Sequence, residues 1–238
     1  MSSLGGDEEN NGSVLKQDLA PVQIQGMLRW GALGCALVVL WLATRHYFGV
    51  IQDARFYTLE ALRGLHPHAF ADDMYFTHGS QGSYSLFSHL YRPFLSWFGV
   101  GAAGMAFTLA GQLCWIYGLY RLARGWVGKR FLWLSLATAI VMPNAYAFFG
   151  YGEDFATPRL FAEALTLLGL AFLHTRPPLS FVLLGLAAAL HPLMALPGLA
   201  VAFVYFALAR PLLWIALPAG AATAWLLGAA GVAPFADL

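Results

Sequence analysis

The chain has 238 residues, of which 59% are hydrophobic and 11% are charged, less than half of the charged fraction of about 25% in a typical soluble domain. This shortage of charge excludes an ordinary soluble globule, and the long apolar runs predict an all-α polytopic membrane helix bundle in the lipid bilayer. The net charge of +1 implies no nucleic acid partner, and the two cysteines lie inside apolar segments, which argues against a disulfide framework.

The N-terminal segment differs in composition from the rest of the chain. Residues 1–26 are rich in Gly, Ser, Asn and acidic residues, and we expect them to form a disordered cytoplasmic tail. They lack the basic head, apolar run and small-residue cleavage site of a signal peptide. Residues 27–238 are therefore predicted to form the transmembrane domain, with an uncleaved anchor as its first segment.

Apolar segments follow one another along the transmembrane domain. A spanning helix needs about 20 residues, and two of the segments fall short of that length. Short segments interrupted by proline are tolerated where the backbone is buried in protein or lines a polar cavity. We predict about seven spans, the fourth and fifth of them short or broken: residues 30–50, 98–120, 131–149, 160–173, 179–190, 193–208 and 212–232.

The distribution of basic residues predicts the orientation. If the N-terminus is cytoplasmic and there are seven spans, eight of the thirteen Lys and Arg residues lie on the inner side. The connection 121–130 contributes four of them and contains no acidic residue. Most acidic residues then fall on the outer side. This pattern is expected of a multi-pass protein of the bacterial inner membrane.

The loop at residues 51–95 is the longest polar interval between apolar segments, and we expect it to be extracytoplasmic. Apolar residues at positions 56, 59, 62 and 65 predict a short helix that begins near Asp53. A second short helix is predicted at residues 84–91, with Tyr84, Phe87, Leu90 and Tyr91 on one side. Both would lie along the membrane surface and hold Asp53 next to the end of the first span.

A second acidic group stands in the next outer loop, where Glu153 and Asp154 precede Arg159. One helical turn later, Glu163 is an ionisable residue inside an apolar run. Arg159 and Glu163 are four residues apart and could pair on one face of a helix. The other interpretation is that Glu163 is an intramembrane functional carboxylate.

The Asp53-Ala54-Arg55-Phe56-Tyr57 run, after a first span and at the start of a long outer loop with interfacial helices, resembles the acidic motif of the type C glycosyltransferase superfamily. That superfamily includes oligosaccharyltransferase catalytic subunits, protein O-mannosyltransferases and lipid A aminoarabinose transferases. Its members use polyprenyl-phosphate-linked sugars and share a module of about seven spans, which would cover nearly this whole chain. By this resemblance Asp53 would be the catalytic carboxylate, and Glu153 or Asp154 would match the second acidic site.

Members of that superfamily usually continue into further spans and often into a soluble domain, whereas this sequence stops at Leu238. The resemblance therefore implies that a partner chain or a further C-terminal region supplies the recognition of the acceptor.

Sugar transfer of this kind has two chemical requirements. Attack on the anomeric carbon needs a carboxylate that takes or orients the acceptor's proton, which we assign to Asp53. The leaving lipid phosphate needs a cation, either a divalent ion such as Mg²⁺ or Mn²⁺ or a basic side chain. The candidate side chains for the phosphate are Arg55, Arg63, Arg92, Arg159 and His191. His191 precedes Pro192, so a helix-capping role is the alternative for its imidazole.

A metal site in the first outer loop is a weaker prediction. Asp72 and Asp73 lie near His66, His68 and His78, which together offer oxygen and nitrogen ligands. Their spacing matches no known ligand motif, and a solvated acidic turn is the other interpretation.

Three other functions remain open on the sequence. In a transporter or channel subunit, Glu163, His191 and the broken segments would line a solute path. In a non-catalytic scaffold subunit, the outer loop would dock a partner. The adjacent His78 and Ser80 allow an intramembrane serine protease, although the sequence has no phosphate-binding glycine loop, no Gly-x-Ser-x-Gly motif and no His-Glu-x-x-His motif.

Overall fold

In a computed structural model of the chain, residues 8–71, 73–77, 85–129, 131–141 and 151–229 are described. Within these residues the protein is all-α, with nine α-helices and two short 3₁₀ helices. Three of these helices are long and apolar enough to cross a membrane: Gln25–Thr44, Phe87–Trp126 and Pro192–Ala209. The coarse prediction of an all-α protein with candidate membrane helices is thereby confirmed, while the count of seven spans stays a prediction.

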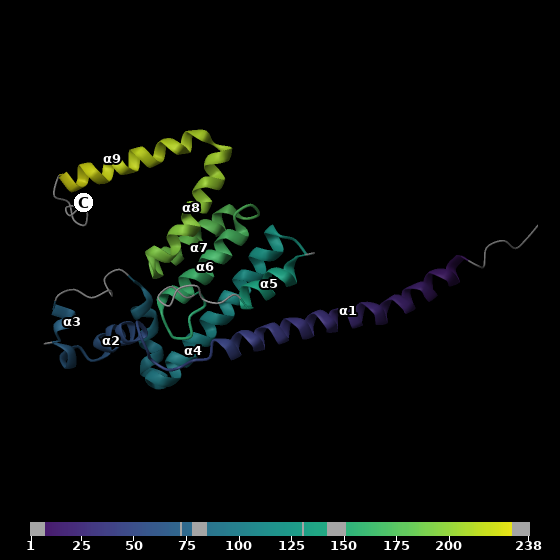
Figure 1. Ribbon diagram of the computed structural model, residues 1–238, viewed down its shortest axis with the longest axis horizontal. Coiled ribbons are helices and arrows are strands. Elements are labelled where there is room, and N and C mark those ends of the chain that lie inside the picture. The colour runs from purple at the N-terminus through teal and green to yellow at the C-terminus, as the bar shows by residue number, and fades with distance from the viewer. Residues whose placement is uncertain (1–7, 72, 78–84, 130, 142–150, 230–238) are drawn as a thin grey trace, which may run out of the picture.

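Helix α1 (Glu8–Thr44) leaves the bundle as a single long rod (Figure 1). It begins well inside residues 1–26, which we expected to be a disordered tail. The helix ends at Thr44, before the predicted end of the span at residue 50, and Gly49 beyond it has a left-handed φ of 99°.

Helix α4 (Phe87–Trp126) combines two predicted elements. The predicted interfacial helix at residues 84–91 and the predicted span at 98–120 are parts of one helix that bends at Gly99, where φ is 73°. Glycine adopts this left-handed conformation without a steric penalty. Phe87 and Tyr91 are buried as expected, whereas Leu90 is exposed, and Tyr84 lies outside the described residues.

Three short helices fill the first loop: α2 (Ala54–Leu65), η1 (Pro67–Phe70) and α3 (Met74–Thr77). The predicted helix after Asp53 is confirmed. Phe56, one of the apolar residues of this predicted interfacial helix, is 42% exposed. The buried residues are Ala54, Tyr57, Thr58, Glu60 and Ala61.

Glu60 explains why α2 turns that face inward. One carboxylate oxygen accepts a hydrogen bond from the hydroxyl of Ser88 on α4, and the other accepts one from the hydroxyl of Tyr75 on α3, both at 3.0 Å. A buried carboxylate with such donors is satisfied. Glu60 therefore ties the three helices together.

Helix α6 (Pro158–Phe172) packs against α4, α7 (Pro177–Leu190) and α8 (Pro192–Ala209) (Figure 1). These helices agree with the predicted segments 160–173, 179–190 and 193–208 to within a few residues. Helix α5 (Leu132–Val141) lies in the first part of the predicted span 131–149. Residues 142–149 lie outside the described residues, and with them Pro143 and Asn144, where the sequence predicts a break or kink.

Glycines on α4 allow α6 to approach closely. A Cβ atom at Gly111 would lie 2.5 Å from Cδ2 of Leu160, and one at Gly118 would lie 3.0 Å from the carbonyl oxygen of Ala164. Both distances are too short for a larger residue. The two glycines are seven residues apart and therefore lie on one face of α4.

The C-terminal elements η3 (Pro211–Ile215) and α9 (Ala216–Ala229) extend away from the bundle (Figure 1). We predicted one continuous span at residues 212–232. The structure divides this segment into a 3₁₀ turn and a helix. Its apolar helical part, Pro211–Gly220, is shorter than the three helices that could cross a membrane. Residues after Ala229 lie outside the described part.

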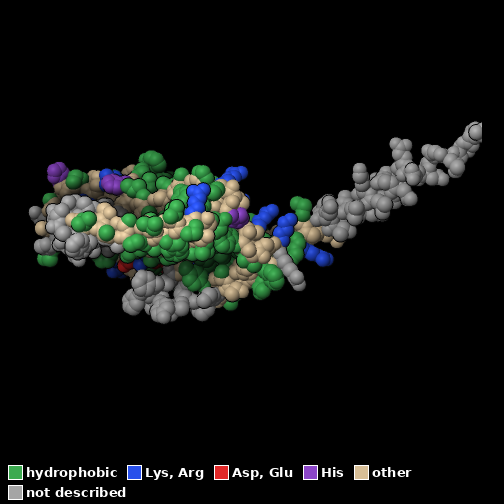
Figure 2. Space-filling model, turned by 90° about the horizontal axis from the view of Figure 1, so that it is seen from above, with side chains coloured by type: hydrophobic (Ala, Val, Ile, Leu, Met, Phe, Trp, Pro, Cys, Tyr) green, Lys and Arg blue, Asp and Glu red, His purple; other side chains and the backbone are tan. Residues whose placement is uncertain are grey.

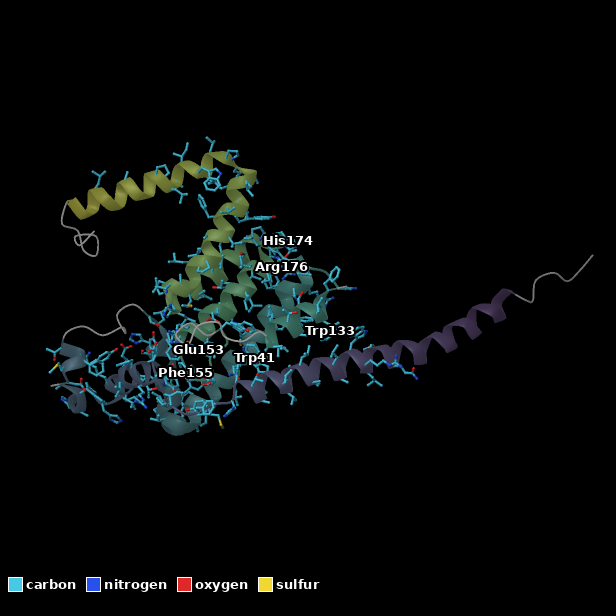
Figure 3. The ribbon with its side chains drawn as sticks, viewed as in Figure 1. Trp41, Trp133, Glu153, Phe155, His174 and Arg176 are labelled. Carbon is cyan, nitrogen blue, oxygen red and sulfur yellow. The ribbon has the colours of Figure 1, made fainter. Side chains whose placement is uncertain are left out.

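The two ends of the bundle differ in charge. Glu153 lies near the first residues of α6, and His174 and Arg176 lie at its far end (Figure 3). Arg121 and Arg124 of α4 line a pocket with His174, so they are at that same far end. On the face that Figure 2 shows, hydrophobic side chains are spread over the bundle, and basic side chains gather near the place where α1 leaves it.

Candidate functional site

Arg159 joins two acidic residues that come from different loops. Its Nη2 atom lies 2.8 Å from Oδ2 of Asp53, and its Nε atom lies 2.9 Å from Oε1 of Glu153. The Nε–H bond does not point at the Glu153 oxygen, so this second contact is an ion pair without hydrogen-bond geometry. We call these three residues the carboxylate–arginine cluster.

The members of the cluster differ in their access to solvent. The side chain of Asp53 is 48% exposed, whereas those of Arg159 and Glu153 are 14% and 6% exposed. Asp53 is therefore the most accessible member of the cluster, and Arg159 keeps a smaller exposed area.

A tight turn between α1 and α2 positions Asp53. The amide of Ala54 bonds to the carbonyl of Ile51 at 3.0 Å, and Gln52 has a φ of 48°. The left-handed conformation costs about 1–2 kcal/mol for a residue other than glycine. The carboxylate of Asp53 does not cap α2, and it reaches Arg159 instead.

The amino end of α6 positions the other two members. Thr157 is the N-cap and Pro158 the first helical residue, which suits the fixed φ of proline. The Thr157 hydroxyl donates a short hydrogen bond to Oε2 of Glu153. Arg159 follows in the first turn, where a cation opposes the helix dipole, and the two carboxylates offset this cost.

Gln112 of α4 connects the two loops that carry the acidic residues. Its side-chain amide donates to the carbonyl of Arg45 at 2.8 Å and to the carbonyl of Glu153 at 3.1 Å. The side chain is completely buried. Our sequence interpretation missed this residue, although a lone amide within an apolar span is a signal for interhelical hydrogen bonding.

An aromatic group lies beneath the cluster. The rings of Trp41 and Trp115 stack with centroids 4.6 Å apart, and Trp115 also stacks on Tyr151. The guanidinium carbon of Arg45 lies 3.9 Å from the Trp41 ring centroid, a cation–π contact of a buried arginine. Gly152 has room only for hydrogen, because a Cβ atom there would lie 2.2 Å from Trp41. This packing fixes the loop before α6.

Glu163 does not pair with Arg159, so that prediction is wrong. Arg159 lies in the first turn of α6, where side chains tilt toward the preceding loop and its carboxylates. Oε2 of Glu163 instead accepts hydrogen bonds from the indole of Trp115 at 3.0 Å and from the amide of Gly152 at 3.1 Å. Glu163 therefore anchors the loop that carries Glu153.

Substitutions of Glu163 should show whether its hydrogen bonds or its negative charge stabilise the protein. Both donors reach the same oxygen, so Glu163→Gln should keep both contacts and change the melting temperature little. Glu163→Ala leaves two buried donors without an acceptor and should lower the free energy of unfolding by about 2–4 kcal/mol. Thermal unfolding in detergent, followed by tryptophan fluorescence, measures both. Equal losses in the two variants would show that the charge itself is needed.

The environment of Glu153 alters its acidity. Burial raises the pKa of this carboxyl to about 6, although Arg159 and the Thr157 hydroxyl lower it. The negative charges of Asp53 and Asp154 raise it further. Desolvation thus outweighs the ion pair. Arg159 must stabilise the charged form of Glu153 near neutral pH.

The raised pKa predicts how stability depends on pH. The folded chain binds the Glu153 proton more tightly than the unfolded chain, whose value is near 4.5. The resulting stabilisation is complete below about pH 4.5 and is lost as the pH rises through about 6. Its size is on the order of 2 kcal/mol. The melting temperature of the wild type minus that of Glu153→Gln should therefore fall over this window and stay level above pH 7. A difference that is constant from pH 4 to 7.5 contradicts this.

The other predicted arginines have different contacts. Arg63 lies over the ring of Phe76 at 4.5 Å from its centroid, and Arg55 is exposed. The guanidinium of Arg92 lies against Gly64, where a Cβ atom would be 2.0 Å from its carbon. Only Arg159 of the predicted arginines joins Asp53 and Glu153 in the described structure.

Two further predicted residues lie close to the cluster without joining it. His191 is near enough to Asp53 and Arg159 to be affected by both charges. Its Nδ1 atom accepts a hydrogen bond from the amide of Met194 at 3.3 Å, so the imidazole caps α8. Asp154 follows Glu153 and is half-buried.

The described residues do not fit a metal ion. Oδ1 of Asp73 accepts a hydrogen bond from the amide of Tyr75 at 2.9 Å, and His66 and His68 are exposed. No three His, Cys, Asp or Glu residues of the described part group closely enough to hold an ion, and Asp72 and His78 lie outside it. At the cluster, the guanidinium of Arg159 occupies the position between the carboxylates.

The site can therefore combine an accessible carboxylate with a fixed guanidinium. Asp53 can accept a proton or a hydrogen bond from a hydroxyl or amine. Nη1 of Arg159 takes part in neither ion pair and can donate to an anion. No family model, no curated protein and no solved structure matches the chain.

Proposed function

We propose that the protein is an integral membrane glycosyltransferase of type C architecture that uses a polyprenyl-phosphate-linked sugar on the extracytoplasmic face. The observation that carries the proposal is the contact of Arg159 with both Asp53 and Glu153. These acidic residues are far apart in sequence and lie in the two outer loops where the resemblance predicts them. Their basic counterpart is one of the residues predicted to bind phosphate.

The proposed reaction forms one bond and breaks another at the anomeric carbon. The hydroxyl or amine of the acceptor attacks that carbon while Asp53 accepts its proton. The bond from the anomeric carbon to the phosphate oxygen breaks, and the polyprenyl phosphate leaves with the electron pair. Arg159 neutralises the charge that develops on that phosphate through its Nη1 atom. Glu153 and Gln112 hold Arg159 and its loop in place.

The charge distribution supports the outer face as the location. The cluster lies at the amino end of α6, and the basic residues of α4 lie at the other end of the bundle. Lysine and arginine favour the cytoplasmic side of a membrane. An extracytoplasmic cluster would meet lipid-linked sugars that face the same compartment.

The transporter alternative depends on Glu163 and His191. Glu163 bonds to Trp115 and Gly152, and His191 caps α8. Both side chains thus have structural contacts at their polar atoms. We therefore favour the transferase, and Glu163→Gln should retain sugar transfer.

The proposal is tested in membranes of the native host, so that any partner chain is present. The chromosomal copy encodes either the wild type or Asp53→Asn. The substrates are polyprenyl phosphates that carry one labelled hexose. The readout is release of free polyprenyl phosphate, which can be measured without knowing which acceptor in the membrane takes the sugar. We expect release with the wild type and little with the variant. Equal release in both membranes, or none with any donor, would overturn the proposal.

A further inference from the structure

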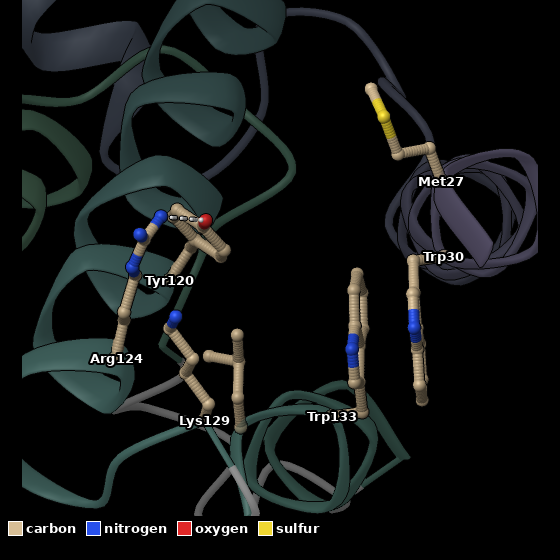
Figure 4. A pocket seen from close by; sticks show the side chains of 7 residues that line it. Met27, Trp30, Tyr120, Arg124, Lys129 and Trp133 are labelled. Carbon is tan, nitrogen blue, oxygen red and sulfur yellow. Dashed lines mark hydrogen bonds between the residues drawn. The ribbon is translucent and has the colours of Figure 1, made fainter. Parts of the chain in front are cut away.

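A hollow lies between α1, α4 and α5, at the end of the bundle opposite the carboxylate–arginine cluster. It consists of two adjoining pockets of about 1000 and 620 Å³. The pockets share Trp30, Tyr120 and Trp133 as lining residues, and Figure 4 shows the larger of the two. We call the two adjoining pockets together the basic groove.

The mouth of the basic groove is positively charged. Arg124 and Lys129 line it, and Nη1 of Arg124 is oriented by a hydrogen bond of 2.8 Å to the hydroxyl of Tyr120 (Figure 4). No carboxylate of the described residues lies within ion-pair distance of either cation. The sequence contains no Asp or Glu anywhere from residue 74 to residue 152. The two charges therefore lack an internal counterion from these segments.

The body of the basic groove is apolar. Leu37, Val38, Leu113 and Ile116 are among its lining residues. The rings of Trp30 and Trp133 stack with centroids 5.5 Å apart and lie between this body and the charged mouth. Tryptophan prefers the level of the lipid headgroups, where an apolar region meets a polar one.

We propose that the basic groove binds an anionic phospholipid of the bilayer, with its phosphate at Arg124 and Lys129 and an acyl chain between α1 and α4. The charged mouth and the apolar body together match such an amphiphile, whereas either alone would not. A lipid there would also fill the space beside α1, which meets α5 through the Trp30–Trp133 pair.

This site is distinct from the proposed reaction and does not depend on it. Gln112 of α4 bonds to the backbone of Glu153 and so marks the level of the cluster on this helix. Arg124 follows it by twelve residues, which places the mouth about 18 Å farther along α4. A phosphate at the mouth therefore cannot contact Arg159. By the predicted orientation the mouth faces the cytoplasmic leaflet, where anionic lipids attract basic residues.

The test measures lipid binding to the purified full-length chain by native mass spectrometry after delipidation. The probes are phosphatidylglycerol, phosphatidylcholine and polyprenyl phosphate. Because two cations contact the phosphate, we expect phosphatidylglycerol to bind about 30-fold more tightly than phosphatidylcholine. Arg124→Gln combined with Lys129→Gln should remove this preference. The matched control, Arg176→Gln combined with Arg210→Gln, changes the same charge outside the groove and should keep it.

A third variant tests the apolar body. Gly31 lines it, and a Cβ atom there would meet nothing within 4 Å, so the side chain of Gly31→Leu has room to start into the groove and should occupy part of it. We expect this variant to bind both phospholipids more weakly while melting at the wild-type temperature.

Several results would overturn the proposal. These are equal affinity for the two phospholipids, a preference that survives the double variant, or unchanged binding in Gly31→Leu. Tighter binding of polyprenyl phosphate than of phosphatidylglycerol, lost in the double variant, would assign the groove to that lipid instead. If the double variant does not fold, the wild type still decides, because a preference based on charge must weaken as salt concentration rises.

Discussion

Replacing Asp53 with asparagine is expected to reduce the proposed sugar transfer by about 100- to 10,000-fold, the usual contribution of a positioned general base. The amide has nearly the same shape and can still accept a hydrogen bond from Arg159, but it cannot take a proton. The ion pair it removes is half exposed and contributes at most about 1 kcal/mol to stability. Activity should therefore fall while the melting temperature changes by only a few degrees.

The matched control is Asp73→Asn. It removes the same charge from the same loop, and the asparagine oxygen can still accept the hydrogen bond from the amide of Tyr75. We expect this variant to keep wild-type transfer. Loss of transfer in both variants would indicate a general effect of loop charge, and full transfer in Asp53→Asn would show that Asp53 is not the base.

Helix positions were predictable where proline marks a start. Pro158, Pro177 and Pro192 each begin a helix of the bundle, and the predicted segments there agree with α6, α7 and α8. Proline lacks an amide hydrogen and has a helical φ, so its effect is local and readable. The bend at Gly99 was not predictable in this way. A glycine in an apolar run serves equally as a packing surface, as Gly111 does.

The buried face of α2 shows a second limit of the sequence. Phe56 is more apolar than Glu60, yet Phe56 is exposed and Glu60 is buried. The burial of Glu60 depends on hydroxyls of Ser88 and Tyr75, which come from other helices. Hydropathy describes one residue at a time and cannot include donors supplied from elsewhere in the chain.

In the candidate site, too, the sequence reveals individual residues but not their contacts. Asp53, Glu153 and Arg159 stand out in the sequence because charges are rare in this chain. Their grouping does not, because the pairing rule for a helix links Arg159 to Glu163, whereas tertiary structure offers it two carboxylates in preceding loops. Gln112 was missed for a related reason, since its partners are backbone carbonyls that no side-chain pattern reveals.

Replacing Arg159 with glutamine should produce a large loss of stability. Glu153 would remain almost buried without its cation, and Asp53 would face it. Removing one partner of a buried ion pair typically costs about 3–5 kcal/mol, and we expect the lower end because Asp53 is half exposed. Arg159→Lys should lose less, since it keeps the charge but not the two-sided geometry. Thermal unfolding at pH 7.5 measures both, and an unchanged melting temperature in Arg159→Gln would contradict the role of the ion pairs.

A second substitution separates the structural role of Arg159 from its role in transfer. Glu153→Gln in the Arg159→Gln background removes the uncompensated buried charge, so much of the lost stability should return. Sugar transfer should stay low in this double variant, because no guanidinium remains to neutralise the leaving phosphate. If transfer returned together with stability, Arg159 would only hold Glu153 and Asp53 in place, and the phosphate would have to meet another cation.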